Sequence, residues 1–246
     1  IKELADLGLL PRLEAAGVCT RELVYASKRG EVVWREPRGR FAGYKWPQVS
    51  IHRGTLQMLL YQAALERIGP DNIHTGHRLF DIRQHGEQAT LSFKKPDSNQ
   101  DLPSFEADLV IACDGIHSTV RAKYVPGDGP PVWSGMILWR GTTVGEPFLT
   151  GGSMLVTGFA QQKFVVYPIR NLPDGRQLIN WIAELTFDES TLKTPQDWNR
   201  LGSRKDFLPR FEGWKSDLLD IPALVRRSSE IYEYPMSDRN PLPTWV

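Results

Sequence analysis

Hydrophobic residues recur at near-helical spacing at the start of the chain, at Ile1, Leu4, Leu7, Leu10 and Leu13. This spacing predicts a helical segment over residues 1–16 that is interrupted at Pro11, because proline lacks the amide hydrogen that a helix interior requires. The pattern then changes to alternation, and residues 22–36 read as two short strands joined by a tight turn at Gly30. The chain is therefore expected to begin with a helix and a β-hairpin.

A longer helix is predicted to begin near Arg53 and to end at Gly69, which a proline follows. Its apolar residues lie largely on one side and are Leu56, Leu59, Leu60, Ala63 and Leu65. Residues 77–84 and 88–95 form a second predicted hairpin around the turn at Gly86. Helix and hairpin thus alternate along the first third of the chain.

An unbroken apolar run occupies residues 109–113 and leads directly into Asp114 and Gly115. A run without alternation is typical of a strand that is buried on both faces of a mostly parallel sheet. Asp114 would then stand at the carboxyl end of this strand, where open α/β sheets bind their ligands. Ser118 is the predicted N-cap of a helix through Arg121, whose free N–H groups would face the same crevice. The alternative is an Asp-Gly turn before a solvated helix.

The pattern becomes β-rich beyond this helix, in segments separated by turns at residues 136–144, 152–159, 163–170 and 177–187. Their regular spacing predicts an antiparallel sheet, so the chain has a mixed α/β (α+β) fold with a second, different layer. Residues 194–214 read as helical, with Thr194 as the candidate cap before Pro195. Residues 232–243 read as a closing loop.

This change of pattern predicts two domains, residues 1–127 and residues 128–246, with residues 22–49 free to pack on the second one. With 246 residues, of which 41% are hydrophobic, the chain can bury a substantial core.

Composition excludes several functional classes. The formal charge is +1, so no overall field favours nucleic acid or an anionic membrane. The chain has two cysteines, Cys19 and Cys113, which define no disulfide framework, and we expect Cys113 to be inert packing in a buried strand and the protein to be cytoplasmic. The five histidines show no metal-ligand spacing, so no metal site is expected.

Several segments in order resemble one protein family. They are SIHRGTLQMLL at 50–60, DLVIACDGIHSTVRA at 108–122, WRGTT at 139–143, VVYPIR at 165–170 and YPMSDRNPLPTW at 234–245. This series is similar to the class A FAD-dependent aromatic monooxygenases of the p-hydroxybenzoate hydroxylase fold, and within them to the phenazine-modifying members, with salicylate and 6-hydroxynicotinate hydroxylases more distant.

The resemblance implies a doubly wound FAD-binding layer, partly present in residues 1–127, and a mostly antiparallel substrate-binding sheet in residues 128–246. It implies FAD as cofactor, NADH or NADPH as transient reductant, and O₂ and a small aromatic or N-heteroaromatic carboxylate as substrates. The glycine-rich motif of the family would precede Ile1 and its GDAAH-like motif would follow Val246. We therefore expect a longer, complete protein, and we expect residues 1–246 alone to be inactive and to hold FAD poorly.

The resemblance also assigns cofactor contacts to Arg53, Gln57, Leu79, Asp114 and Gly115. Arg53 lies in the first turn of its helix, where a guanidinium and the helix dipole together attract a pyrophosphate. Gln57 follows one turn later on the same face. The alternatives are a surface salt bridge for Arg53 and an ordinary strand position for Leu79.

For the substrate, the resemblance points to Trp139, Arg140 and Tyr167, because an aromatic ring needs flat apolar walls with few polar groups. The alternatives are core packing for Trp139, an exposed strand position for Arg140 and a strand end for Tyr167. The sequence assigns no catalytic base. Two rival functions stay open: a non-catalytic remnant or binding module of this fold, and a flavin enzyme of the same fold with another reaction, such as epoxidation or halogenation.

Overall fold

The computed structural model describes residues 1–188 and 200–242. The chain divides into two compact units. The first unit contains Ile1–Ala64 and Gly135–Met236, and the second contains Leu65–Ser134 together with the residues from Ser237 onward. The predicted boundary near residue 127, which concerns the domains of the complete protein, stays a prediction.

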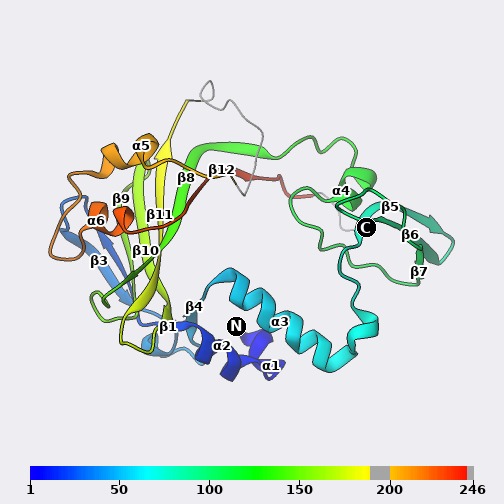
Figure 1. The fold of residues 1–246 in the computed structure, drawn as a ribbon, viewed down its shortest axis with the longest axis horizontal. Helices are drawn as coiled ribbons and strands as arrows, with labels where there is room; N and C mark the ends of the chain where they lie inside the picture. Colours follow the sequence, from blue (N-terminus) through cyan, green and yellow to red (C-terminus); the bar gives the residue numbers. More distant parts are fainter. Residues whose placement is uncertain (189–199, 243–246) are drawn as a thin grey trace. The chain divides into compact units, whose positions relative to one another are not determined.

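A seven-stranded sheet dominates the first unit (Figure 1). Its order is β12 (Ile231–Asp238), β8 (Val132–Gly145), β11 (Gln177–Thr186), β10 (Gln162–Asn171), β9 (Ser153–Phe159), β2 (Glu22–Ala26) and β3 (Val32–Pro37). From β8 to β9 the neighbours pair antiparallel, whereas β2 pairs parallel with β9 and antiparallel with β3. The predicted antiparallel sheet is confirmed, and so is the first hairpin, whose turn contains Gly30 at φ 87°.

The core lies on one face of this sheet, beneath α5 (Arg204–Phe207), η4 (Leu208–Phe211) and α6 (Ile221–Arg226) (Figure 1). Because side chains alternate along a strand, every second residue of β10 and β11 points into it. Phe164 and Trp181 are fully buried and stack with ring centroids 5.8 Å apart. The Trp181 indole N–H donates to the Ser228 hydroxyl over 2.7 Å, so the one polar atom of this ring is satisfied.

The predicted closing loop is wrong over its first part, because residues 231–238 form β12 at the edge of the sheet. An edge strand tolerates Pro235, since a missing N–H there need not break a ladder bond. The predicted cap Thr194 and Pro195 lie outside the described residues, and the described part of that segment is helical at α5 and η4.

The amino-terminal helix is interrupted earlier than predicted. It consists of α1 (Lys2–Asp6) and α2 (Leu10–Ala16), and the break contains Gly8 at φ 69°, a conformation that favours glycine. Pro11 stands instead in the first turn of α2, where its missing N–H costs nothing. Short strands β1 (Val18–Thr20) and β4 (Gln48–Ser50) pair antiparallel, and η1 (Gly39–Ala42) lies between β3 and β4.

The long helix α3 (Arg53–Ile68) follows β4 and confirms the predicted start at Arg53. Its apolar side is buried less than expected, because Ala63 is its one fully buried residue and Leu60 is 38% exposed.

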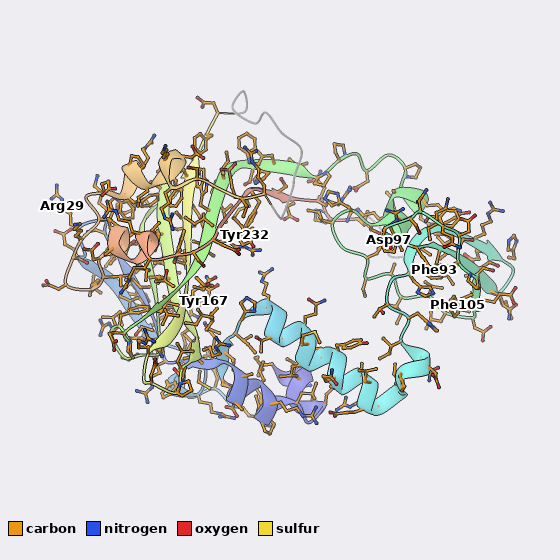
Figure 2. All side chains as sticks on the ribbon, viewed as in Figure 1. Arg29, Phe93, Asp97, Phe105, Tyr167 and Tyr232 are labelled. Carbon is orange, nitrogen blue, oxygen red and sulfur yellow. The ribbon has the colours of Figure 1, made fainter. Side chains whose placement is uncertain are left out.

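The second unit contains η2 (Pro70–Asn72), β5 (Arg78–His85), β6 (Gln88–Lys94), β7 (Phe105–Ala107) and α4 (Thr119–Tyr124). The strands form an antiparallel sheet in the order β5-β6-β7, which confirms the second hairpin. Phe93 and Phe105, both labelled in Figure 2, pack edge to face with their ring centroids 5.7 Å apart.

The predicted buried strand at residues 109–113 is not formed. These residues belong to no strand, Leu109 is 77% exposed and Ile111 is 78% exposed. Cys113 is exposed as well, so the expectation of inert packing is wrong. A strand of a parallel sheet needs hydrogen-bonded neighbours, and the described part of the chain places none beside this run.

Candidate functional site

The start of α4 is organised around Asp114 in the second unit. Its carboxylate oxygen Oδ2 accepts hydrogen bonds from the backbone N–H of Thr119 at 2.8 Å and of Val120 at 3.3 Å. The Ser118 hydroxyl accepts from the Arg121 N–H at 2.9 Å, which confirms Ser118 as the N-cap. The prediction of free N–H groups at this helix start is wrong, because side chains of the same segment satisfy these three.

The surroundings of Asp114 favour its charged form. Burial raises the pKa of this carboxyl, but hydrogen bonds from the Ser118 side chain and from the backbone of Val120, Asp114 and Thr119 outweigh it and leave the pKa below its ordinary value. The carboxylate is therefore ionised at neutral pH and can accept further hydrogen bonds.

Leu79 and Gly115 lie at the same helix start. The Leu79 carbonyl oxygen is 3.4 Å from the Thr119 hydroxyl, which donates to it. Gly115 has φ 80°, and a Cβ built on it would meet nothing within 4 Å, so its backbone faces open space. The structure thus brings together three of the predicted cofactor residues, Leu79, Asp114 and Gly115.

Arg239 fixes this region from a distant part of the sequence. Its guanidinium donates to the Ile116 carbonyl and to the Asp128 carboxylate, each over 2.6 Å. Arg121 also donates to Asp128, and the hydrogen bonds from Arg121 and Arg239 hold the pKa of Asp128 below its ordinary value. Sequence reasoning missed this network, although Arg239 lies in the motif at 234–245.

In the first unit, the sheet face opposite the core carries a group of polar side chains on adjacent strands. Tyr167 of β10 pairs in register with Asn180 of β11, and Asn180 pairs with Thr142 of β8. Arg140 pairs with Ile182, two residues further along β11, so its side chain lies on the same face. We call this surface the open face; Figure 2 labels Tyr167 on it.

Two arginines act electrostatically on Tyr167. Burial raises the pKa of its phenol, whereas Arg53 of α3 and Arg140 act in the opposite direction and Tyr234 adds to the rise. The structure therefore brings Arg53, Arg140 and Tyr167 together, with the Arg140 guanidinium carbon 5.0 Å from the centroid of the Tyr234 ring. Gln57 is exposed one turn further along α3.

Trp139 points away from this group. It is 2% exposed, stacks on Phe207 with centroids 5.2 Å apart, and donates its indole N–H to Glu233 Oε2 over 2.8 Å. Successive strand residues face opposite sides, so Trp139 belongs to the core face while Arg140 belongs to the open face. The substrate role stays a prediction for Trp139, and its position favours the alternative of core packing.

Sequence reasoning missed Asn180. Its amide nitrogen Nδ2 is buried and has no hydrogen-bond partner in the structure. The available signal was its place in QLINWIAEL, where the alternating pattern puts a single amide among apolar residues on the open face.

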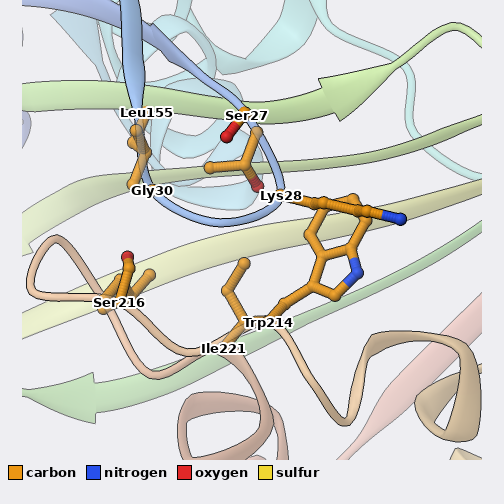
Figure 3. A pocket seen from close by; sticks show the side chains of 9 residues that line it. Ser27, Lys28, Gly30, Leu155, Trp214, Ser216 and Ile221 are labelled. Atoms are coloured by element: carbon orange, nitrogen blue, oxygen red, sulfur yellow. The ribbon is translucent and has the colours of Figure 1, made fainter.

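Two concave features of the first unit are a small cavity and an open groove, and none of the predicted site residues lines either of them. Figure 3 shows the smaller cavity, of about 10 Å³, beside Gly30, Trp214 and Ser216, which has room for roughly one water molecule. The larger is an open groove of about 660 Å³ along Arg21, Phe41 and Gln177.

Among residues 1–188 and 200–242 there is no cluster of three or more potential metal ligands. Within the same described ranges, no helix has the length and apolar character that crossing a membrane requires.

Within each unit, the residues present suit one part of a flavin dinucleotide. A phosphate needs cationic donors, and the Arg53 guanidinium has no hydrogen bond or ion pair with any described residue. A hydroxyl needs an acceptor, which the ionised Asp114 supplies beside the open backbone of Gly115.

Comparison with known proteins agrees with this chemistry. The chain is 40% identical over 248 residues to the phenazine 1,6-dicarboxylic acid hydroxylase PhzS of Lysobacter antibioticus, covering 100% of this chain and 61% of that protein. It is 24% identical to 6-hydroxynicotinate 3-monooxygenase of Bordetella bronchiseptica, covering 88% of this chain and 52% of that protein.

Its fold matches that of Klebsiella pneumoniae HpxO, solved with FAD and uric acid, with a TM-score of 0.72 at 20% identity over 98% of this chain and 57% of HpxO. The chain thus spans about three fifths of the length of PhzS and HpxO. The family model described as an FAD binding domain matches residues 3–198. The chain therefore belongs to the FAD binding domain family, whose solved relatives share its mixed α/β fold.

Proposed function

We propose that the complete protein hydroxylates an aromatic or N-heteroaromatic carboxylate, using FAD, O₂ and NADH or NADPH. The observation that carries this proposal is the open face, where Arg140 of β8 and Tyr167 of β10 lie on the same side of one sheet, and neither side chain has a hydrogen bond to a described residue. The 40% identity to a phenazine dicarboxylic acid hydroxylase supports an acidic aromatic substrate.

FAD, when bound, supplies the chemistry by which one oxygen atom of O₂ reaches the ring and the other becomes water. In the first unit, Arg53 would bind a phosphate of the cofactor and Gln57 a polar group near it. In the second unit, Asp114 would accept from a hydroxyl of the cofactor, and the backbone of Leu79 and Gly115 would approach it closely.

For the substrate, Arg140 would bind a carboxylate, and Tyr167 would donate from its hydroxyl. Because burial raises the pKa of Tyr167, the phenol keeps its proton at neutral pH and remains a donor. The role of these residues is to bind and orient the ring and to help exclude water from it.

A reducing cytoplasm is the proposed location, and small molecules rather than nucleic acid or membranes are the proposed partners. Cys19 and Cys113 are both free thiols, which suits a reducing compartment, and the formal charge of +1 supports no polyanionic partner.

The proposal is tested by NAD(P)H oxidation in the complete protein with a panel of phenazine, salicylate and hydroxynicotinate carboxylates. At least one carboxylate should accelerate NADH or NADPH oxidation and yield a hydroxylated product. A complete, FAD-loaded protein that forms no hydroxylated product with any of them would contradict it.

Replacing Asp114 by alanine should weaken FAD binding by the complete protein about tenfold or more. The reason is that one charge-assisted hydrogen bond contributes roughly 1.5–3 kcal/mol, and the acid also holds the N–H groups of Thr119 and Val120 in place. Flavin fluorescence titration measures the affinity. Asp174→Ala, in an exposed turn of the other unit, is the control and should leave the affinity unchanged. Equal affinities for the two variants would remove Asp114 from the cofactor site.

A further inference from the structure

Asn180 is an unsatisfied amide in the middle of the open face. It lies on β11, a central strand, and its Nδ2 atom is buried with no hydrogen-bond partner. A buried donor without an acceptor costs about as much free energy as a lost hydrogen bond, so native proteins rarely keep one without a reason. The residue as a whole is half-buried on the open face.

The neighbours of Asn180 leave its Nδ2 atom without an acceptor. Tyr167 stands directly opposite on β10, and Arg140 lies diagonally across on β8, one pair further along the ladder. Diagonal neighbours in a sheet are within reach of long side chains. The Arg140 guanidinium has no hydrogen bond or ion pair with any described residue, and its carbon lies 5.0 Å from the centroid of the Tyr234 ring.

Two carboxylates, one on β11 and one just before β12, have other partners. Glu184 of β11 pairs with Lys163 at 2.7 Å, and Glu230 accepts from the Tyr232 hydroxyl at 2.8 Å. No acid among the described residues therefore satisfies the Asn180 amide or the Arg140 guanidinium. A planar guanidinium and an amide NH₂ on neighbouring strands match the two oxygens of one carboxylate.

We infer that Asn180 is a specificity-determining residue, which together with Arg140 binds the carboxylate of an aromatic ligand on the open face. This inference rests on the proposed function and refines its substrate class. The carboxylate of the ligand must lie above β11 and β8. A ligand with a neutral substituent at that place binds less tightly. The amide carries no charge, so it selects by position and geometry while Arg140 supplies the charge.

Calorimetric titration of the complete, FAD-loaded protein with phenazine-1-carboxylate and with phenazine-1-carboxamide tests the inference. The two probes share a ring system and differ in charge at one substituent. The variants are Asn180→Leu, which removes the donor at similar size, and Asn180→Asp, which replaces it with a repelling charge. Asn171→Leu, at the end of β10, is the control. Far-UV circular dichroism establishes that each variant is folded.

The unsubstituted protein and the Asn171→Leu control should bind the carboxylate more tightly than the carboxamide. Asn180→Leu should weaken carboxylate binding about tenfold or more and carboxamide binding less than about threefold, and Asn180→Asp should weaken carboxylate binding at least as much.

Failure of the inference and failure of the proposed function give different results. If the unsubstituted protein prefers the carboxylate and both Asn180 variants bind it as well as the control does, Asn180 is not part of the site and the proposed function stands. If one Asn180 variant does not fold, the other decides. A complete, FAD-loaded protein without substitutions that binds neither probe contradicts the proposed substrate site, and the inference falls with it.

Discussion

Replacing Trp181 by alanine should lower the free energy of unfolding of the chain by about 3–5 kcal/mol. The ring is fully buried, stacks on Phe164 and lies 5.9 Å from the Phe207 ring, so its removal leaves a cavity that the sheet and helices cannot close. The variant also leaves the Ser228 hydroxyl without the indole donor.

Urea denaturation followed by circular dichroism measures this difference. The matched control is Trp34→Ala, because Trp34 is 59% exposed on the edge strand β3 and pairs only with Tyr25 across the hairpin. Trp34→Ala should lower the free energy of unfolding by less than about 1 kcal/mol. Similar losses for the two tryptophans would mean that the helices α5 and α6 do not cover the sheet as described.

Replacing Arg140 by alanine should weaken binding of an aromatic carboxylate by about ten- to a hundredfold. A charge-assisted hydrogen bond contributes roughly 1.5–3 kcal/mol, and Arg140 lies on the open face of a strand beside Asn180. Unlike Lys163 of β10, which pairs with Glu184, Arg140 has no carboxylate partner among the described residues. Its guanidinium is held over the Tyr234 ring, so little side-chain entropy is lost when a ligand binds. Arg140→Lys should recover only part of the affinity, because an ammonium lacks the planar two-pronged geometry.

Calorimetric titration of the complete, FAD-loaded protein with phenazine-1-carboxylate measures this loss of affinity. Arg176→Ala serves as the control, since Arg176 is an exposed arginine of the same unit that is paired with Asp174 in a turn. It removes the same charge far from the proposed ligand and should leave the affinity unchanged. If Arg140→Ala and Arg176→Ala lose affinity equally, the loss comes from the change in net charge, and Arg140 makes no direct contact with the ligand.

Local patterns predicted the elements whose folding depends on nearby residues. Both hairpins form where alternation and a glycine turn predicted them, because short turns and cross-strand pairs are determined within a few residues. The start of α3 and the cap at Ser118 follow from the same local chemistry. The antiparallel sheet from β8 to β11 also follows from regular spacing of strands and turns.

Features that depend on distant partners could not be predicted in this way. Residues 109–113 have the composition of a central strand, but a strand needs neighbours, and the described chain gives them none. Pro235 suggested a loop, although an edge position in the sheet accepts it.

The candidate site was predicted in part. The resemblance selected Arg53, Arg140 and Tyr167, which the structure brings together, but it could not show that Trp139 and Arg140 face opposite sides of the sheet. Alternation along β8 decides that, once the core face is known. Asn180 became visible only through the missing partner of its amide, which a sequence does not reveal.

We propose above that the complete protein transfers oxygen from O₂ to an aromatic carboxylate with the help of FAD. The most direct test is turnover of the complete, FAD-loaded protein with phenazine-1-carboxylate, NADH or NADPH and ¹⁸O₂, followed by mass spectrometry of the product. We expect a hydroxylated ring that carries one ¹⁸O atom derived from the labelled O₂. A product labelled from water instead, or NAD(P)H consumption without any oxygenated aromatic product across the substrate panel, would contradict it.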